Sequence, residues 1–267
     1  MARDLHVATM SGKNHVLMLE QMLWTLSRTW EELPQIRLLS DGTFTSAHLA
    51  RIQRGYTGTV ELVEAEALER HHESRGRPEL VEFSRANYFG RKLAFIIAEA
   101  ELHPTLWADN DILFYGDFSE DLRRLLARGS ILGATRDASF GKTTPLFGYD
   151  PVLAKHLFGN RPDVPSLNAG FCFASGPVYD AHGISEIVRW SLQDGRHGYL
   201  TEQTIVAYTA LASAGILWDE PVVHMADDDI YTLGPTYRHQ PWKARHYTGN
   251  VRHLFWRDAF CRRCSRS

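Results

Sequence analysis

Hydrophobic and polar positions in the first sixty residues follow two alternating patterns. Short apolar runs at 5–10, 36–39 and 59–63 have the length of buried strands. The segments 15–30 and 45–54 instead place apolar residues three or four positions apart, as on one face of a helix. This order of strand, helix, strand, helix and strand predicts a parallel sheet covered by helices on both faces.

The rest of the chain continues the mixture of elements with less regular spacing. We expect an exposed helix end and loop at 64–78, helices at 92–100, 117–128, 184–191 and 201–214, strands at 106–108, 130–134 and 171–174, a loop at 137–149, and a strand pair or loop at 216–224. A length of 267 residues, 44% of them hydrophobic, suits a single domain with a sizeable core. We divide it into a first half, 1–117, and a second half, 118–267.

The segment 106–117, LWADNDILFYGD, places two acidic residues directly after an apolar strand. Side chains two residues apart in an extended chain point the same way, so Asp109 and Asp111 are expected to project together. Two carboxylates this close repel, and one would tend to hold a proton. A hard divalent cation removes the repulsion by binding both. The alternative is a strand followed by an acidic turn that binds nothing.

This segment resembles the DxD motif of nucleotide-sugar-dependent glycosyltransferases of the GT-A fold. In that family the two aspartates hold a manganese or magnesium ion that bridges the donor diphosphate. The resemblance implies that Asp109 and Asp111 bind the metal and that Asn110 contacts the donor. The metal neutralises the charge that develops on the leaving nucleoside diphosphate as the glycosidic bond breaks.

A second segment, 165–175 (PSLNAGFCFAS), resembles the NAG-F segment found after the DxD in many GT-A enzymes. The resemblance implies that Asn168, Ala169 and Gly170 form a tight approach to the donor sugar, with Asn168 also a candidate catalytic residue. Small residues suit this place because a backbone close to a sugar leaves no room for side chains. The alternative is an ordinary turn into a core strand.

Two helix starts supply further candidates. In the resembled family a basic residue on the helix before the DxD strand often reaches the donor, and Arg91 and Lys92 occupy that place. Glu202 and Gln203 match a position where the family places an acid or amide near the reacting carbon, so both are candidate catalytic residues. We expect Thr201 to cap their helix. The alternative for Arg91 and Lys92 is that both are solvated charges. The alternative for Glu202 is an acid at a helix start that only interacts favourably with the helix dipole.

The segment 244–256, ARHYTGNVRHLFW, resembles the H-Y/F-x-G-x-x-K-P-W element of family-eight-like glycosyltransferases. The resemblance implies that His246 is the third metal ligand and that Gly249 lets the backbone approach the diphosphate. The Lys-Pro pair of the family is absent, so the diphosphate contact passes to Arg252. We expect this segment to act as a lid that orders when donor and metal bind.

Base contacts in this fold come from the ends of the first strands, here around Ala8, Thr9 and Asp41. A net charge of −3 gives no reason to expect a nucleic-acid partner. The N-terminal sequence has no long apolar segment, so we expect no signal peptide, no membrane span and a cytoplasmic location. Cys261 and Cys264 form a CxxC that indicates either a structural zinc or exposed thiols in a frayed tail.

Together these motifs predict an α/β protein with the Rossmann-like GT-A fold: a mostly parallel sheet flanked by helices, whose nucleotide-binding first half ends in the DxD. The implied function is a metal-dependent, hexosyltransferase-like enzyme that moves a sugar from a nucleoside diphosphate to a hydroxyl acceptor, with retention of configuration. One alternative is a phosphoryl transferase of the haloacid dehalogenase type, with Asp227 and Asp228 as late metal acids. Another is a non-catalytic nucleotide-binding protein.

Overall fold

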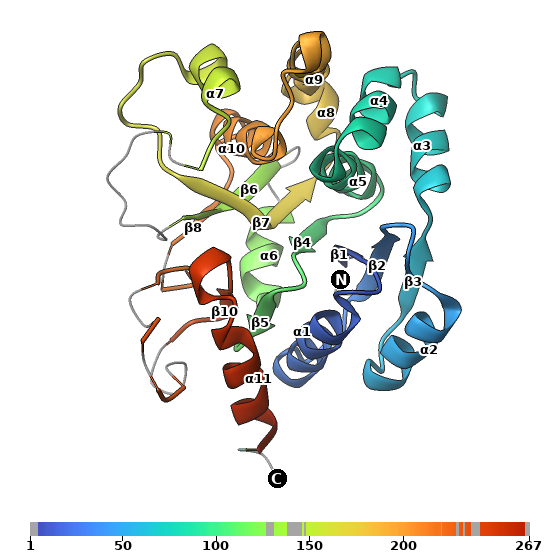
Figure 1. Cartoon of the computed structure of the whole chain (residues 1–267), viewed down its shortest axis with the longest axis vertical. Coiled ribbons are helices and arrows are strands. Elements are labelled where there is room, and N and C mark those ends of the chain that lie inside the picture. Colours follow the sequence, from blue (N-terminus) through green and yellow to red (C-terminus); the bar gives the residue numbers. More distant parts are fainter. Residues whose placement is uncertain are drawn as a thin grey trace.

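Seven strands form the central sheet of the protein (Figure 1). The structure is a computed structural model, which describes residues 5–126, 131–137, 146, 148–219, 221–227, 230–231, 233–235 and 241–264. The strands are β1 (His6–Ser11), β2 (Gln35–Ser40), β3 (Val60–Val63), β4 (Thr105–Ala108), β6 (Ile131–Arg136), β7 (Leu167–Ser175) and β8 (Leu217–Trp218). They lie in the order β3-β2-β1-β4-β7-β6-β8. Neighbouring strands are parallel except on the two sides of β7, which runs antiparallel to both β4 and β6.

Helices cover both faces of this sheet. They are α1 (Val16–Thr29), α2 (Ser46–Gly55), α3 (Ala65–Ser74), α4 (Pro78–Ala86), α5 (Tyr88–Leu102), α6 (Ser119–Leu126), α7 (Pro151–Phe158), α8 (Val178–Ala181), α9 (Ile184–Leu192), α10 (Thr201–Ala212) and α11 (Leu254–Cys264), with short 3-10 turns η3 (Gln193–Gly195) and η5 (Gly249–Val251). Figure 1 shows α1 and α2 on one side of the sheet and α5 and α10 on the other. The fold class predicted from the sequence is therefore confirmed.

The alternation of side chains along each strand divides the core between the two faces. In β4, Leu106 and Ala108 belong to the cluster that includes α1, whereas Trp107 belongs to the cluster that includes α5. The Trp107 ring meets Phe95 of α5 edge-on, with centroids 6.3 Å apart. Because β4 is covered on both faces, its residues are all buried, and polar side chains can reach solvent only after it ends.

A second, smaller sheet lies beyond the end of β4. It contains β5 (Ile112–Phe114), β9 (Val223–His224) and β10 (Ala244–His246) in the order β5-β10-β9, with β10 antiparallel to β5. Helix α11 packs against this sheet through a core of its own, formed by Leu113, Tyr247, Val251, Leu254, Phe255 and Ala259. Figure 1 shows β10 and α11, the last elements of the chain, beside β5 from its middle.

Several local predictions are wrong. The segment 64–78 contains the regular helix α3, because Leu68 and His72, four residues apart, are both buried against the core. Burial lowers the pKa of His72 to about 4. Thr201 is the first residue of α10 rather than its cap, and its hydroxyl accepts a hydrogen bond from the Gly198 N–H. Cys261 and Cys264 lie in α11 rather than in a frayed tail.

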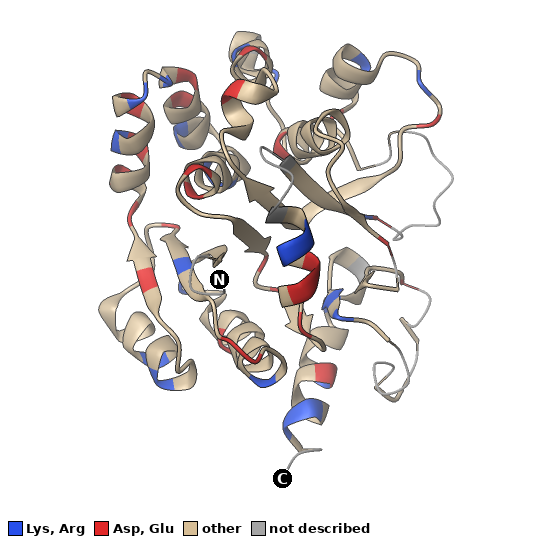
Figure 2. Ribbon diagram, turned by 180° about the vertical axis from the view of Figure 1, so that it is seen from behind, with Lys and Arg blue, Asp and Glu red and all other residues tan. Residues whose placement is uncertain are grey.

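Charged residues of both signs belong mainly to the helices, while the strands of the central sheet contain few of them (Figure 2). Within the described part of the chain, every helix is too short or too polar to cross a lipid bilayer. Most of the predicted loop at 137–149, together with Asp228, lies outside the described residues.

Candidate functional site

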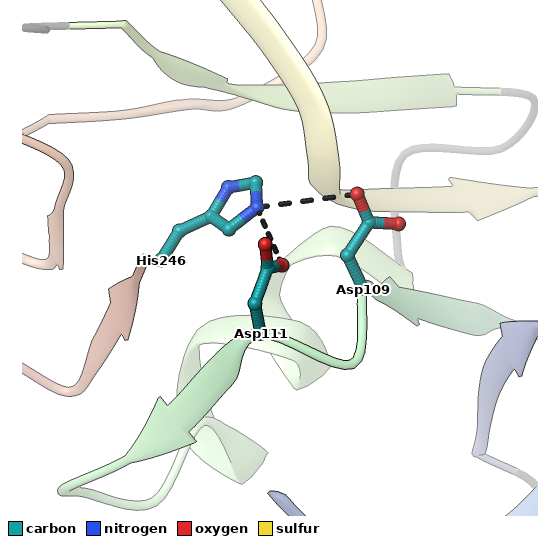
Figure 3. Close-up of side chains that lie close together, drawn as sticks. All are labelled: Asp109, Asp111 and His246. Carbon is teal, nitrogen blue, oxygen red and sulfur yellow. Dashed lines mark hydrogen bonds and ion pairs between the residues drawn. The ribbon is translucent and has the colours of Figure 1, made fainter. Parts of the chain in front are cut away.

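Three side chains able to bind a metal ion meet where β4 ends. Asp109 and Asp111 belong to the turn between β4 and β5, and His246 is the last residue of β10 (Figure 3). One ligand atom of each lies within 4.8 Å of the others. The His246 Nε2 atom is 3.1 Å from Asp111 Oδ1 and 3.9 Å from Asp109 Oδ2. The two aspartates converge through a turn, not through the extended strand that the sequence pattern suggested.

Strand pairing explains why these residues meet across 135 positions of sequence. In the antiparallel pair β5–β10, His246 lies opposite Ile112, the residue after Asp111. The Tyr247 N–H donates to the Asp111 carbonyl oxygen at 2.9 Å, so the ladder continues into the turn. Backbone pairing therefore brings His246 beside Asp111, independently of any contact between their side chains.

Gly170 makes room for the group. Because β7 is antiparallel to β4, its beginning lies at the end of β4, and the Asp109 N–H donates to the Gly170 carbonyl oxygen at 2.8 Å. A Cβ atom on Gly170 would lie 2.0 Å from His246 Cε1 and 2.7 Å from Asp109 Oδ2. Any side chain here would therefore displace two of the three ligands. Asn168, Ala169 and Gly170 lie within β7, which begins earlier than the strand expected at 171–174, so the alternative of an ordinary turn is wrong.

Asp111 is buried among cationic or proton-donating groups. Its Oδ2 atom accepts two hydrogen bonds from the Arg252 guanidinium, at 2.7 and 3.1 Å, while Oδ1 faces His246. Burial raises the pKa of Asp111, but His246 and Arg252 outweigh it and lower the pKa to about 2. The expectation that one of the two adjacent carboxylates holds a proton is therefore not met at Asp111.

Asp109 is more exposed and is oriented from the opposite side. It accepts a hydrogen bond from Trp107 Nε1 at 2.7 Å, and its Oδ1 atom lies 3.2 Å from Lys92 Nζ. The Lys92 ammonium group is buried and also lies 3.4 Å from Glu202 Oε1. Burial lowers the pKa of Lys92, but Asp109 and Glu202 outweigh it and raise the pKa, so the lysine keeps its charge. Burial, assisted by the charge of Asp109, raises the pKa of Glu202 to about 7.

The three ligands fit a hard divalent cation. Two ligand atoms bonded at right angles to one ion at about 2.1 Å lie about 3.0 Å apart, close to the 3.1 Å between His246 Nε2 and Asp111 Oδ1. Two carboxylates and one imidazole suit manganese or magnesium better than a thiolate-preferring ion. Cys261 and Cys264 take no part in the cluster of Asp109, Asp111 and His246, which could hold a metal ion and which we call the metal-binding group.

A cavity of about 300 Å³ opens beside the metal-binding group. Its predicted members are Lys92, Asp109, Asn110, Asp111 and Arg252. The other lining residues, which no sequence motif indicated, are mostly aromatic or apolar: Met10, His15, Met18, Tyr88, Phe89, Trp107 and Tyr199. Tyr199 is 73% exposed and packs edge-on against Phe89, with ring centroids 4.7 Å apart. Aromatic residues lining a cavity are a typical feature of ligand sites, but their exposure is visible only in the structure and no local sequence motif marks them.

Other predicted residues lie outside this cavity lining. Ala8 and Thr9 are fully buried in β1 and leave a ligand no surface, and Thr9 donates instead to Asn110 Oδ1 at 3.0 Å. The remaining predicted residues bond to nearby groups, are at least partly buried, or lie elsewhere in the chain. Asp41 accepts from Thr43, Asn168 accepts from the Gly170 N–H, Gln203 donates to the Gly148 carbonyl, Ala169 is buried, Arg91 is half-buried, and Gly249 begins η5.

Comparison with solved structures identifies the fold. The crystal structure of mouse xyloside xylosyltransferase 1 in its apo form matches 93% of this chain and 99% of its own, with a TM-score of 0.64 and 12% identity. The galactosyltransferase LgtC in complex with donor and acceptor sugar analogues matches 96% of this chain and 95% of its own, with a TM-score of 0.60 and 14% identity. The WbbM bifunctional glycosyltransferase matches 97% of this chain and 50% of its own, with a TM-score of 0.63 and 15% identity.

No protein-family model and no curated protein matches the chain by sequence. Identities this low show the fold and not the activity. The chain has the GT-A fold of glycosyltransferases, as the resemblance of its motifs predicted.

Proposed function

We propose that this protein is a metal-dependent glycosyltransferase that moves a sugar from a nucleoside diphosphate to a hydroxyl group of an acceptor. The observation that carries the proposal is the group of Asp109, Asp111 and His246 at the edge of the 300 Å³ cavity, in a GT-A fold. This combination joins a site suited to a hard cation with space for a ligand. Neither feature alone would separate a transferase from another metal-binding protein.

The proposed metal would be held by Asp109, Asp111 and His246, with manganese and magnesium as the candidates. When bound, it supplies positive charge that stabilises the leaving nucleoside diphosphate. The protein adds to that charge with Arg252, whose guanidinium lines the cavity beside Asp111 and suits bidentate contact with a phosphate. Lys92 keeps the Asp109 carboxylate oriented from inside the protein.

Glu202 and Gln203 have separate places in the proposal. The Glu202 carboxyl lies behind Lys92, so we assign it to the electrostatic balance of the site rather than to direct proton transfer. Gln203 is half-buried and bonded to the Gly148 carbonyl, and its proposed place near the acceptor stays a prediction. Retention of anomeric configuration and transfer of a hexose are also proposals, supported by the family-eight likeness of the 244–256 segment.

The alternative functions receive different support. For the haloacid dehalogenase type, the metal-binding group contains His246 from β10 and not Asp227, and Asp228 lies outside the described residues. The non-catalytic alternative fits the same cavity and ligands. It is separated from a transferase by turnover and not by binding.

The proposal is tested by a thermal-shift screen of nucleoside diphosphates and their sugars, with and without Mn²⁺ or Mg²⁺, followed by an assay of donor hydrolysis and transfer. A ligand that binds only the folded state raises the melting temperature. We expect a shift with one nucleotide that requires the metal, turnover of its sugar, and manganese at least as effective as magnesium. Full activity in EDTA would contradict the metal dependence, and binding without turnover on any acceptor would favour the non-catalytic alternative.

A further inference from the structure

The strand that holds His246 is too short to fix its own position. β10 has three residues and pairs with β5 over three residues and with β9 over two, and a sheet this small needs packing on one face to be stable in water. Metal ligands nevertheless need placement to about 0.5 Å for tight binding. Contacts on the other face of β10 must therefore supply the precision.

Those contacts converge on one carboxylate of the C-terminal helix. Side chains alternate along a strand, so Arg245 and Tyr247, on either side of His246, point away from the metal-binding group. Both meet Asp258 of α11: the Tyr247 hydroxyl donates to Asp258 Oδ2 at 2.8 Å, and Arg245 Nη1 lies 3.5 Å from the same oxygen. Arg257 Nε donates to the other oxygen, Oδ1, at 2.6 Å.

The contacts around Asp258 are buried and extend to β5. The side chains of Arg245 and Asp258 both have 0% exposure, and a buried charge that loses its partner is strongly destabilising. The Tyr247 and Tyr115 hydroxyls are 2.6 Å apart, and Tyr115 follows β5 directly. Arg262 of α11 also donates to the carbonyl oxygen of Phe114, the last residue of β5. Helix α11 thus bonds both to β10, which carries His246, and to β5, which directly follows Asp111.

We infer that Asp258 is a positioning residue for the metal centre. By holding Arg245 and Tyr247, it sets the place of His246 relative to Asp111, although it touches neither the metal-binding group nor the cavity. This inference rests on the metal-dependent function proposed above. It adds α11 to the machinery of the site as the element that determines how tightly the metal is bound.

The test compares Asp258→Asn with a matched buried carboxylate elsewhere. Glu79 of α4 has a similar set of partners, since it accepts hydrogen bonds from the Tyr179 and Ser185 hydroxyls and from Arg189, and it lies outside the cavity lining. Both Asp258→Asn and Glu79→Gln should lower the melting temperature. Only Asp258→Asn should weaken Mn²⁺ binding to the full chain, by roughly tenfold, as is typical when a support of a metal ligand is removed. Binding is measured by electron paramagnetic resonance of free Mn²⁺ at a temperature where each variant is folded.

A second, milder pair keeps the test decisive if Asp258→Asn does not fold. Tyr247→Phe removes only the hydroxyl that reaches Asp258, and Tyr179→Phe removes the equivalent hydroxyl at Glu79. We expect weaker Mn²⁺ binding in Tyr247→Phe and unchanged binding in Tyr179→Phe. The inference is overturned if Asp258→Asn and Tyr247→Phe bind Mn²⁺ as tightly as the parent, or if the control variants lose as much affinity. A parent protein that binds no Mn²⁺ would instead overturn the proposed function itself, and the inference with it.

Discussion

Asp109 and Asp111 are separated by one residue, yet they belong to two different regions of the protein. Asp109 is supported from the α5 side by Lys92 and Trp107, and its side chain is 32% exposed toward the cavity. Asp111 is supported from the C-terminal side by His246 and Arg252, and its side chain is 8% exposed. The first carboxylate is thus available to a ligand, whereas the second also joins β5 to the C-terminal segment.

The two aspartates therefore have different roles. Both are proposed metal ligands, so loss of either should remove activity. Only Asp111 also holds together two segments distant in sequence, so only its loss should lower stability much.

The largest expected effect is that of Asp111→Asn. Loss of a proposed metal ligand should reduce turnover by at least about 10²-fold, comparable to removal of a main electrostatic contact in an active site. The same change removes the anionic partner of His246 and Arg252 and should lower the unfolding free energy by about 2 kcal/mol. Urea unfolding without metal measures the second effect. A variant as stable as the parent would show that Asp111 does not join the two regions.

Asp109→Asn should lose as much turnover as Asp111→Asn with a much smaller change in stability, within about 1 kcal/mol. The reason is that Lys92 keeps its other partner, Glu202, and that the amide oxygen can still accept from Trp107. The check is the same pair of assays on both variants. Equal destabilisation by the two substitutions would remove the distinction drawn above.

Glu202→Gln should change how stability depends on pH. The pKa of Glu202 is raised from 4.5 to about 7 by burial and by Asp109, so the folded protein binds this proton more tightly than the unfolded chain does. Its contribution to stability is therefore complete below pH 4.5 and is lost as the pH rises from there through about 7, by up to about 3 kcal/mol at 1.36 kcal/mol per unit. Between pH 5 and pH 8, the melting temperature of the metal-free protein should fall less with rising pH in Glu202→Gln than in the parent. An equal fall of the melting temperature with pH in parent and variant would contradict the raised pKa of Glu202.

Arg252→Ala should have the smallest effect on the fold, about 1 kcal/mol or less, because its 60% exposed side chain is screened by water and Asp111 keeps His246 as a partner. It should weaken nucleoside diphosphate binding more than Mn²⁺ binding, since the guanidinium faces the cavity and is not a metal ligand. Calorimetric titration with each ligand separates the two effects. An equal loss for both would indicate that Arg252 acts only through Asp111.

The residues of the site that could be predicted from the sequence belong to short local motifs. The DxD turn follows its strand directly, and the segment around His246 and Gly249 keeps the spacing of a known element, so their chemistry is visible without the fold. The expected strands and helices of the first sixty residues are likewise confirmed, because each has a clear periodicity.

The parts that could not be predicted depend on pairing between distant segments. Nothing local shows that β7 runs against β4 and brings Gly170 to the metal-binding group as part of a strand. Lys92 and Glu202 were expected to face donor and acceptor separately, but α5 and α10 pack on one face of the sheet and pair them with each other. Asp258 belongs to no motif, and the role inferred for it follows only from its buried contacts with Arg245 and Tyr247. The C-terminal lid and the cytoplasmic location stay predictions, although His246 itself lies in a buried strand.

The central claim is that Asp109, Asp111 and His246 bind one divalent cation in a nucleotide site. Its most direct test is anomalous diffraction from crystals grown with Mn²⁺ and the nucleoside diphosphate selected by the thermal-shift screen. We predict one strong manganese peak bonded to all three side chains at about 2.2 Å, with the diphosphate in the adjoining cavity beside Arg252. A manganese peak elsewhere, or a nucleotide bound in this cavity with no metal between the three side chains, would contradict the account.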